Sequence, residues 1–409
     1  MMSAPELPTK TQVCIIGAGP AGVIAAYLFA LRGVSVVLLE GEKDFDREFR
    51  GDTFHASSLE VLEQLGFADD VVALCNSKVG QLNFKSAEHS LQVADFSAME
   101  CKFPFVGIIP QEKFLSYMVS KAEVLPDFKI LMGARVKELI QVDGKITGVK
   151  YKQDDKEYDL GSLLTIGADG RGSTARRLAN IKLGKTAPPM DVLWFRVTIP
   201  KDVELKESVD VRVGSGTMLV MVNRGDYIQC GYIIMKGSYK ELRNEGIEHF
   251  HNEVKTLAPE LTSTISEIGD WKQCAILSVV TGCVEQWCQD GLLLIGDAAH
   301  IMSPVGGVGI NYAIQDAVAT VNLLADAIKE ERLSITDLAK VQSRREPAVK
   351  FIQTFQMFAQ KRIITSALKS DKPFSPPLPL RVVSKLPFMR KRIAKFLAYG
   401  KCPERVEGV

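Results

Sequence analysis

The sequence predicts an α/β fold, in which a Rossmann-like domain is interrupted by an inserted, mainly antiparallel β-sheet domain and followed by a helical C-terminus. Three observations support this prediction. Short apolar runs that lead into glycine or an acidic residue occur within residues 11–40, 163–180 and 291–330, as is typical of buried parallel strands. Short runs of alternating polar and apolar residues occupy the segments between them. Helical periodicity dominates from Ile310 onward.

The N-terminal segment predicts a βαβ unit. Residues 11–16 and 35–39 are short apolar runs, and we expect both to be buried strands. Residues 20–31 lie between them and begin with a proline, which suits the first turn of a helix. A further helix is expected at residues 57–65, and Gly66 is placed to end it.

A glycine motif, G-x-G-x-x-G, joins the first strand to the first helix. In this pattern Gly17 permits a tight turn, Gly19 lets the backbone approach a pyrophosphate, and Gly22 lets the helix pack closely on the strand. Glu40 ends the second strand, where a carboxylate can accept the hydroxyls of an adenosine ribose. A chance glycine-rich turn is the alternative. We predict a dinucleotide site that suits FAD or NAD better than NADP, since an acid disfavours a 2′-phosphate.

The middle of the chain predicts the inserted sheet, because residues 80–109 and 190–235 alternate in the manner of antiparallel strands. The other elements expected here are a helix at 111–122, a hairpin around Asp143-Gly144 within 129–151, a buried strand at 163–166 and a helical segment at 238–257.

A second glycine-rich segment favours FAD over NAD. Asp297 follows the apolar run 292–295, so its carboxylate should emerge at the carboxyl end of a parallel strand. Pro304, Gly306, Gly307 and Gly309 then form a loop that opens a long helix. Backbone N–H groups at such a helix start can face the pyrimidine edge of a flavin.

Three motifs, in this order along the chain, make it resemble the FAD-dependent aromatic hydroxylases, the p-hydroxybenzoate-hydroxylase-like single-component flavoprotein monooxygenases. The motifs are GAGPAG at 17–22, GADGRGSTAR at 167–176 and GDAAHIMSPVGGVGIN at 296–311. Arg50-Gly51-Asp52 is also similar to a segment of that family. The resemblance covers roughly residues 10–330.

The resemblance implies roles for particular residues. Arg50 would touch the flavin diphosphate and help position the reductant, Gln111 would contact the ribityl chain, and Asp169 would serve both FAD and NAD(P)H. Asp297 would bond the ribityl or diphosphate region, and residues 304–309 would lie beside the isoalloxazine ring. The cofactor-binding residues expected from the motifs are Gly17, Gly19, Ala21, Gly22, Glu40, Arg50, Gln111, Asp169, Gly296, Asp297, Pro304, Gly307, Gly309 and Asn311.

The implied domains are an FAD-binding domain, a substrate domain and a tail. The FAD-binding domain would comprise 1–75, 106–183 and 284–360, the substrate domain 76–105 and 184–283, and the basic helical tail 361–409.

The resemblance also implies an activity. NAD(P)H would reduce FAD, and O2 would add to it as a flavin C4a-hydroperoxide that hydroxylates an aromatic or similar small organic substrate. A halogenase-like or geranylgeranyl-reductase-like flavoenzyme, or a non-catalytic flavin-binding protein, remains as an alternative. Halogenation is disfavoured, because residues 195–200 read FRVTIP, with Phe and Val in place of both tryptophans of the halogenase signature WxWxIP.

No catalytic side chain and no metal site can be assigned from the sequence. His300 is a general base or, as we favour, a satisfied polar contact. The aromatic residues Trp194, Tyr227 and Tyr232 of the inserted sheet are candidates for lining an aromatic pocket.

Composition and charge restrict the possible partners and location. The formal net charge of +1 gives no general attraction to nucleic acid. We expect a cytoplasmic protein whose eight cysteines are reduced, since no CxxC pair, signal peptide or membrane-spanning run is visible.

The basic tail is electrically distinct from the rest of the chain. Residues 361–409 carry 12 basic and three acidic residues, a charge of +9, which leaves −8 on the remainder. Met389, Ile393, Phe396 and Leu397 share one face of a predicted helix. Either this face packs on the body, which we favour, or it lies on an anionic membrane.

Overall fold

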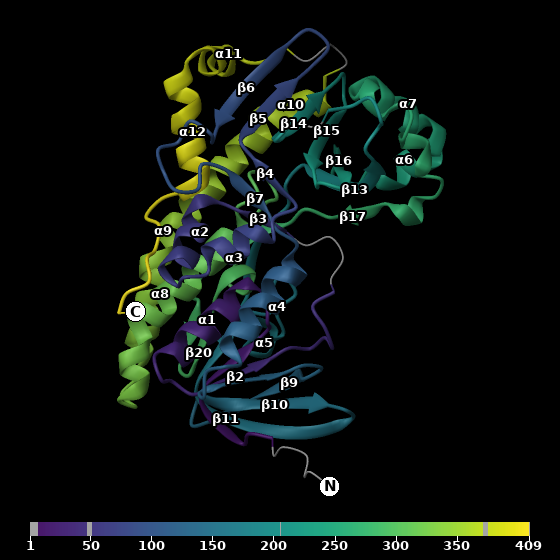
Figure 1. The fold of residues 1–409 in the computed structure, drawn as a ribbon. Coiled ribbons are helices and arrows are strands. Elements are labelled where there is room, and N and C mark those ends of the chain that lie inside the picture. The colour runs from purple at the N-terminus through teal and green to yellow at the C-terminus, as the bar shows by residue number, and fades with distance from the viewer. Residues whose placement is uncertain (1–6, 47–50, 205, 371–374, 409) are drawn as a thin grey trace.

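A computed structural model describes residues 7–46, 51–204, 206–370 and 375–408 (Figure 1). Its Rossmann-like part is built on a sheet whose parallel strands run in the order β20-β11-β1-β2-β8. These strands are β1 (Lys10–Ile16), β2 (Val36–Leu39), β8 (Phe128–Leu131), β11 (Lys156–Gly167) and β20 (Leu292–Leu294). Antiparallel strands complete the sheet: β9 (Arg135–Val142), β10 (Lys145–Gln153) and β19 (Cys288–Gln289).

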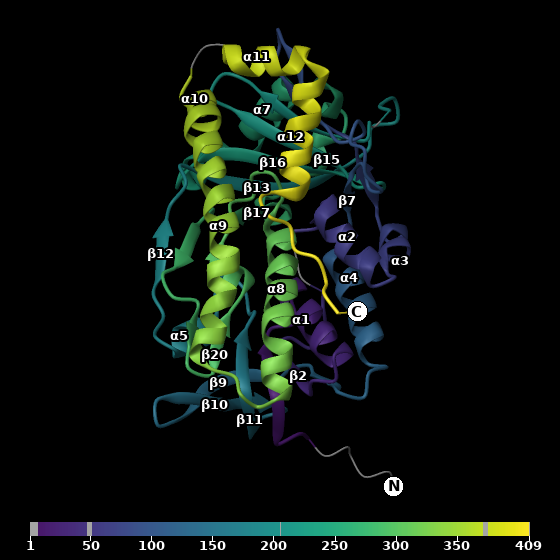
Figure 2. The same cartoon turned by 90° about the vertical axis from the view of Figure 1, so that its left-hand side faces the viewer.

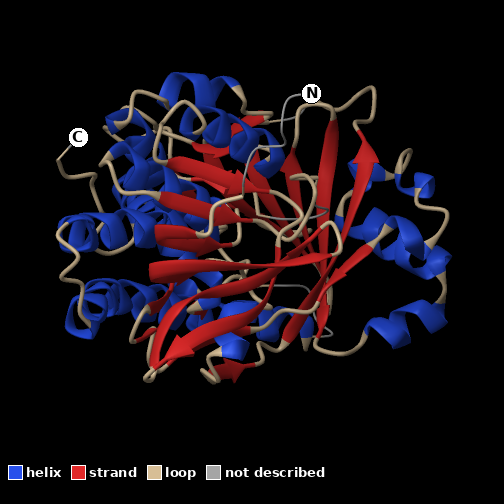
Figure 3. Cartoon of the chain, turned by 90° about the horizontal axis from the view of Figure 1, so that it is seen from below, coloured by secondary structure: helices blue, strands red, loops and turns tan. Residues whose placement is uncertain are grey.

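Helices lie beside the strands in the view from below (Figure 3). The parallel strands are largely apolar, and most of their residues are buried in the main core. Helix α1 packs against both α4 and α8, and α8 packs against α9. The helices of this part are α1 (Pro20–Leu31), α2 (Ala56–Gln64), α3 (Ala68–Ala73), α4 (Gln111–Ala122), α5 (Thr174–Leu178), α8 (Gly309–Lys329) and α9 (Ile335–Ala359). The predicted helices at 20–31 and 111–122 are confirmed with the same bounds.

The inserted part is a seven-stranded sheet in the order β17-β13-β16-β15-β14-β5-β6. Every neighbouring pair is antiparallel except β14 and β5, which are parallel. The sheet unites strands from 76–105 with strands from 184–283, although the domain boundaries themselves stay a prediction. Its strands are β5 (Gln81–Lys85), β6 (Ser90–Asp95), β13 (Met190–Thr198), β14 (Ser208–Val213), β15 (Met218–Asn223), β16 (Tyr227–Met235) and β17 (Ala275–Leu277).

The helical segment expected at 238–257 is observed, but as two helices. The segment is divided into α6 (Tyr239–Glu245) and α7 (Ile247–Leu257). Gly246 separates them with a φ of +94°, a conformation that an α-helix cannot contain. The break lets both helices lie against one face of the seven-stranded sheet (Figure 1).

Two small sheets connect the larger parts. Strands β3 (Thr53–Phe54), β7 (Val106–Ile108) and β4 (Ser77–Val79) form one of them. Strands β12 (Leu183–Thr186), β18 (Thr281–Val284) and β21 (His300–Ile301) form the other. They lie where the chain passes from one large sheet to the other.

The C-terminal segment packs on the body. Helix α9 continues through a π-helical turn into α10 (Thr365–Leu368), and α11 (Leu378–Lys385) and α12 (Pro387–Tyr399) follow. Helix α12 contacts β6 and α2, and its residues Leu397 and Ala398 belong to the main core. The last residues then run back along α8 (Figure 2). The favoured arrangement, with the apolar face of this helix turned to the body, is therefore observed.

Candidate functional site

The turn between β1 and α1 is shaped by its glycines. Gly17 has a φ of +98°, and a Cβ on Gly22 would lie 1.9 Å from the carbonyl oxygen of Gly17. At Gly19 the nearest atom to such a Cβ is 3.9 Å away, so a side chain there would not collide with the protein. Helix α1 starts directly after this glycine. Two glycines therefore allow the turn to form, and the third leaves room for a ligand at the start of α1.

Glu40 lies at the end of β2 and is only 5% exposed. Its carboxylate accepts hydrogen bonds from the N–H of Ala18 at 2.9 Å and of Glu42 at 3.0 Å. The side chain thus fastens the glycine turn to the neighbouring strand. Its contact with a ribose remains a prediction.

Asp169 organises the loop that follows β11. Its carboxylate accepts hydrogen bonds from the Ser173 hydroxyl at 2.5 Å and from the N–H groups of Thr174 and Ala175 at 2.6 and 3.0 Å. Burial raises the pKa of Asp169, while these donors act against the rise. The carboxylate therefore satisfies the first N–H groups of α5. The predicted contact of Asp169 with FAD and NAD(P)H is untested.

Two arginines of the same loop join it to the Gly296-Asp297 turn. Arg176 is buried and donates to the carbonyl oxygen of Ala298 at 2.7 Å. Arg171 pairs through Nε with an Asp297 carboxylate oxygen at 3.2 Å. The second and third motifs thus form one connected edge at the carboxyl ends of β11 and β20. Neither arginine was predicted as a site residue, although both lie inside the GADGRGSTAR motif.

The loop from Pro304 to Gly309 is held by Asn311, which is 4% exposed. The Asn311 amide oxygen accepts from the N–H of His55 and from the Ser58 hydroxyl, both at 2.8 Å. The Thr53 hydroxyl donates to the carbonyl oxygen of Gly307 at 2.5 Å. With these groups bonded to the protein, α8 begins at the loop without a side-chain cap. These contacts fix the shape of the loop at the start of α8.

Gln111 stands at the start of α4 and donates to the carbonyl oxygen of Gly51 at 3.2 Å. It therefore supports the segment that follows Arg50. Arg50 itself lies outside the described residues. The roles expected of both residues toward the flavin remain predictions.

His300 is a polar contact, as we favoured, through its Nε2, whereas its Nδ1 has no partner among the described residues. It is 1% exposed, and its Nε2 lies 2.5 Å from a carboxylate oxygen of Asp316. Asp316 also accepts from the N–H of Gly296 at 3.0 Å and from Nε of Arg345 at 2.9 Å. Burial alone would raise the pKa of Asp316, but His300 and Arg345 outweigh it and hold this pKa low.

The seven-stranded sheet has one face covered by α6 and α7. Its other face carries candidate substrate-binding side chains. Trp194 lies there, opposite Gly231 on the next strand, and a Cβ on that glycine would lie 2.8 Å from the indole ring. Gln229 is on the same face, 4% exposed, and its Nε2 has no hydrogen-bond partner among the described residues. Tyr227 shares this face, whereas Tyr232 points to the opposite one and bonds Glu253 at 2.5 Å. Including Tyr232 in an aromatic pocket here was wrong.

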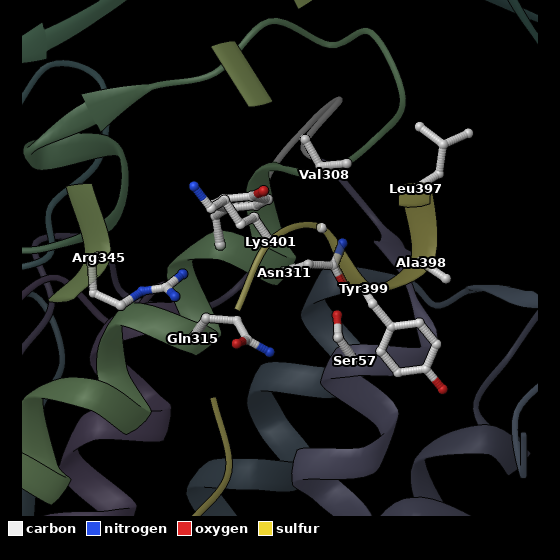
Figure 4. A pocket seen from close by; sticks show the side chains of 11 residues that line it. Ser57, Val308, Asn311, Gln315, Arg345, Leu397, Ala398, Tyr399 and Lys401 are labelled. Carbon is white, nitrogen blue, oxygen red and sulfur yellow. The ribbon is translucent and has the colours of Figure 1, made fainter. Parts of the chain in front are cut away.

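Figure 4 shows a cavity between the start of α8 and the C-terminal segment. It is too small to hold a substrate. Its volume is about 10 Å³, enough for one water molecule at most. Its lining includes Asn311, Tyr312 and Arg345 from the body and Tyr399 and Lys401 from the C-terminal segment. It lies where that segment meets α8.

These residues fit FAD. Glycine-rich loops lead into both α1 and α8, and a Cβ at Gly19 would meet no atom closer than 3.9 Å. Residues 10–355 match a family described as an FAD binding domain.

Similar proteins agree with this assignment. The 6-methylpretetramide 4-monooxygenase of Streptomyces rimosus is 29% identical over 399 residues, which is 97% of this chain and 94% of that one. Digeranylgeranylglycerophospholipid reductase 2 of Methanosphaera stadtmanae is 25% identical over 337 residues, 80% of this chain and 81% of that one. The crystal structure of p-nitrophenol 4-monooxygenase PnpA from Pseudomonas putida DLL-E4 shares the fold. Its TM-score is 0.79 at 18% identity, with 97% of this chain and 100% of that one covered. The chain belongs to the FAD-binding-domain family and, within it, to the p-hydroxybenzoate-hydroxylase-like flavoprotein monooxygenases.

Proposed function

We propose that this protein uses NAD(P)H and O2 to hydroxylate an aromatic or related small organic molecule. The observation that carries the proposal is the pair of glycine-rich loops that lead into α1 and α8, within the residues matched by the FAD-binding family. The relative from Streptomyces rimosus, a monooxygenase matched over almost its whole length, supports the same reaction class.

Residues of this chain would hold FAD along the edge of the parallel sheet. The α1 start and Glu40 would bind its ADP half, and Asp297 the ribityl or diphosphate region. The loop held by Asn311 would lie against the ring. Bound FAD would supply electron transfer from NAD(P)H and activation of O2. The protein's part is to orient the two partners and exclude water.

The substrate would lie between this loop and the sheet face that carries Trp194. Trp194 offers an aromatic surface, and Gln229 offers a buried N–H donor. A buried donor favours a substrate that carries an acceptor such as a carbonyl or phenolic oxygen. These features support a planar, oxygen-bearing aromatic substrate.

A lipid reductase is a second candidate, because the relative from Methanosphaera stadtmanae carries that name. The two activities differ in their use of oxygen. We expect purified protein to oxidise NAD(P)H faster when an aromatic substrate from a compound panel is added, with O2 consumed and a product heavier by one oxygen atom. Turnover of a prenyl lipid without O2, and no stimulation by aromatic compounds, would instead assign the reductase activity.

A further inference from the structure

The end of the molecule formed by α11 exposes large apolar side chains. Leu378 is 74% exposed, Val382 54% and Phe388, at the start of α12, 57%. None of the residues of α11 is buried. Helix α11 lies at one extremity of the molecule, opposite the β9–β10 hairpin (Figures 1 and 2). We use the name α11 surface for these three apolar residues together with the basic residues of α11 and α12, which are Arg381, Lys385, Arg390, Lys391, Arg392 and Lys395.

The α11 surface is also basic. The sequence from residue 378 to residue 399 contains no Asp or Glu. It contains six cations: Arg381, Lys385, Arg390, Lys391, Arg392 and Lys395. Within the described part of the chain, the ion pair formed by this set is Lys391 with Glu100. Arg381 and Arg390 donate instead to neutral groups, including the carbonyl oxygen of Pro376 and the amide oxygen of Gln92.

The contacts of α11 and α12 with the rest of the protein leave Leu378, Val382 and Phe388 exposed. The apolar side of α12 is already used, since Ala394, Leu397 and Ala398 are buried against the body. In α11, Leu380 and Val383 are half-buried and lie toward β6 and α12, while Leu378 and Val382 remain outside. Apolar side chains beside cations, on a short exposed helix, are typical of a helix that lies in a membrane interface.

We propose that the α11 surface docks this protein on an anionic phospholipid bilayer. Its cations would lie at the level of the lipid phosphates, and Leu378, Val382 and Phe388 would enter the boundary with the acyl chains. The contact is peripheral: no helix within the described ranges is long and apolar enough to cross a membrane. The charge of +9 on residues 361–409, against −8 on the remainder, complements an anionic surface.

The experiment measures co-sedimentation of the FAD-loaded full-length protein with vesicles. One set is phosphatidylcholine alone, and the other contains about 30% phosphatidylglycerol to supply negative charge. We expect binding to the anionic set, at least about tenfold weaker binding to the neutral set, and release near 1 M salt, where the Debye length falls to about 3 Å.

Two variants form a matched pair. Val382 and Val142 are both 54% exposed, but Val142 ends β9 at the opposite extremity. We expect Val382→Glu to weaken binding to the anionic vesicles at least about tenfold, because it places a charge where an apolar side chain should enter the interface. Val142→Glu should bind as the unchanged protein does. Lys385→Glu tests the electrostatic part and should also weaken binding.

Several results would overturn the proposal. These are no sedimentation with anionic vesicles at low salt, equal binding to both vesicle sets, and equal losses for Val382→Glu and Val142→Glu. Sedimentation velocity without lipid tests another occupant: a dimer that Val382→Glu abolishes would assign the surface to a second copy of this chain. Flavin content and circular dichroism of each variant show that the fold is retained.

Discussion

At the scale of single residues, the candidate site depends on side chains whose partners lie far away in the chain. Asp297 is paired with Arg171, so its carboxylate already has a fixed direction at the end of β20. His55 lies under the loop that starts α8, with Nε2 3.1 Å from the carbonyl oxygen of Gly306. Each of the two residues gives a measurable prediction.

Replacing Asp297 with Ala should weaken FAD binding by roughly tenfold to a few hundredfold. A hydrogen bond to a charged group contributes about 1.5–3 kcal/mol, which corresponds to that range. Flavin fluorescence titration of the apoprotein measures the change. Arg171→Ala is the control, since it removes only the ion-pair partner. Equal losses in both variants would show that Asp297 acts through the arginine and not on the cofactor.

His55 should make stability depend on pH. Burial lowers its pKa to about 4, against about 6.5 in an unfolded chain, although backbone hydrogen bonds oppose the change. Between these values the unfolded state binds the proton and the folded state does not. Stability is therefore complete above pH 6.5 and falls by up to about 3 kcal/mol as the pH drops to 4.

The check compares urea unfolding of the unchanged protein and of His55→Gln from pH 7 to pH 4. The variant should lose less stability on acidification, because it has no group to protonate at this position. Parallel pH profiles of the two proteins would contradict the prediction.

At the scale of elements, glycines of the first βα turn have different roles. One is required for the helix to pack on the strand, and another leaves room for a ligand. Gly22 is needed for packing, because any Cβ there would collide with the backbone of Gly17. Gly19 has no such neighbour, since the nearest atom lies at 3.9 Å. The same motif therefore contains positions with different physical demands.

The pair Gly19→Ala and Gly22→Ala separates these demands. Gly22→Ala should destabilise the apoprotein by about 1–3 kcal/mol, the usual cost of overpacking. Gly19→Ala should leave apoprotein stability unchanged within about 0.5 kcal/mol yet weaken FAD, because its methyl group occupies the approach to α1. Thermal unfolding of the two apoproteins and flavin titration measure the effects. A stable Gly22→Ala apoprotein with normal FAD affinity would be incompatible with this reading of the turn.

At the scale of the whole molecule, the seven-stranded sheet is joined to the Rossmann-like part by a buried ion pair. Arg224, in the turn between β15 and β16, bonds Asp52, which precedes β3. Their side chains are 10% and 19% exposed, and burial lowers the pKa of Arg224 to about 10. A second contact, from the Ser77 hydroxyl to the carbonyl oxygen of Asn223, lies beside it.

Removing one partner of this pair should cost more than removing both. Asp52→Ala leaves a buried guanidinium without its counter-charge, and we expect a loss of roughly 3 kcal/mol. The double variant Asp52→Ala with Arg224→Met should regain at least about 1 kcal/mol of that loss. Chemical unfolding of the two single variants and the double variant measures the coupling. Additive losses would show that the pair is not coupled.

Local patterns explain why much of the fold was predictable. The first βαβ unit, its glycine turn and helix α4 depend on neighbouring residues, and their bounds agree with the prediction. The same holds for the hairpin at Asp143-Gly144. The helix break at Gly246 was missed, because a single glycine within a helical pattern does not by itself reveal its φ.

The fold class, the family and the positions of the three motifs follow from the sequence, since each motif lies within one short segment. The contacts between side chains that are distant in the chain are visible only in the folded molecule. It joined Asp316 to Gly296, His300 and Arg345, turned Tyr232 away from the candidate substrate face, and left Val382 exposed while Leu397 is buried. The physical reason is that such contacts depend on strand register and helix docking, which the whole chain sets together.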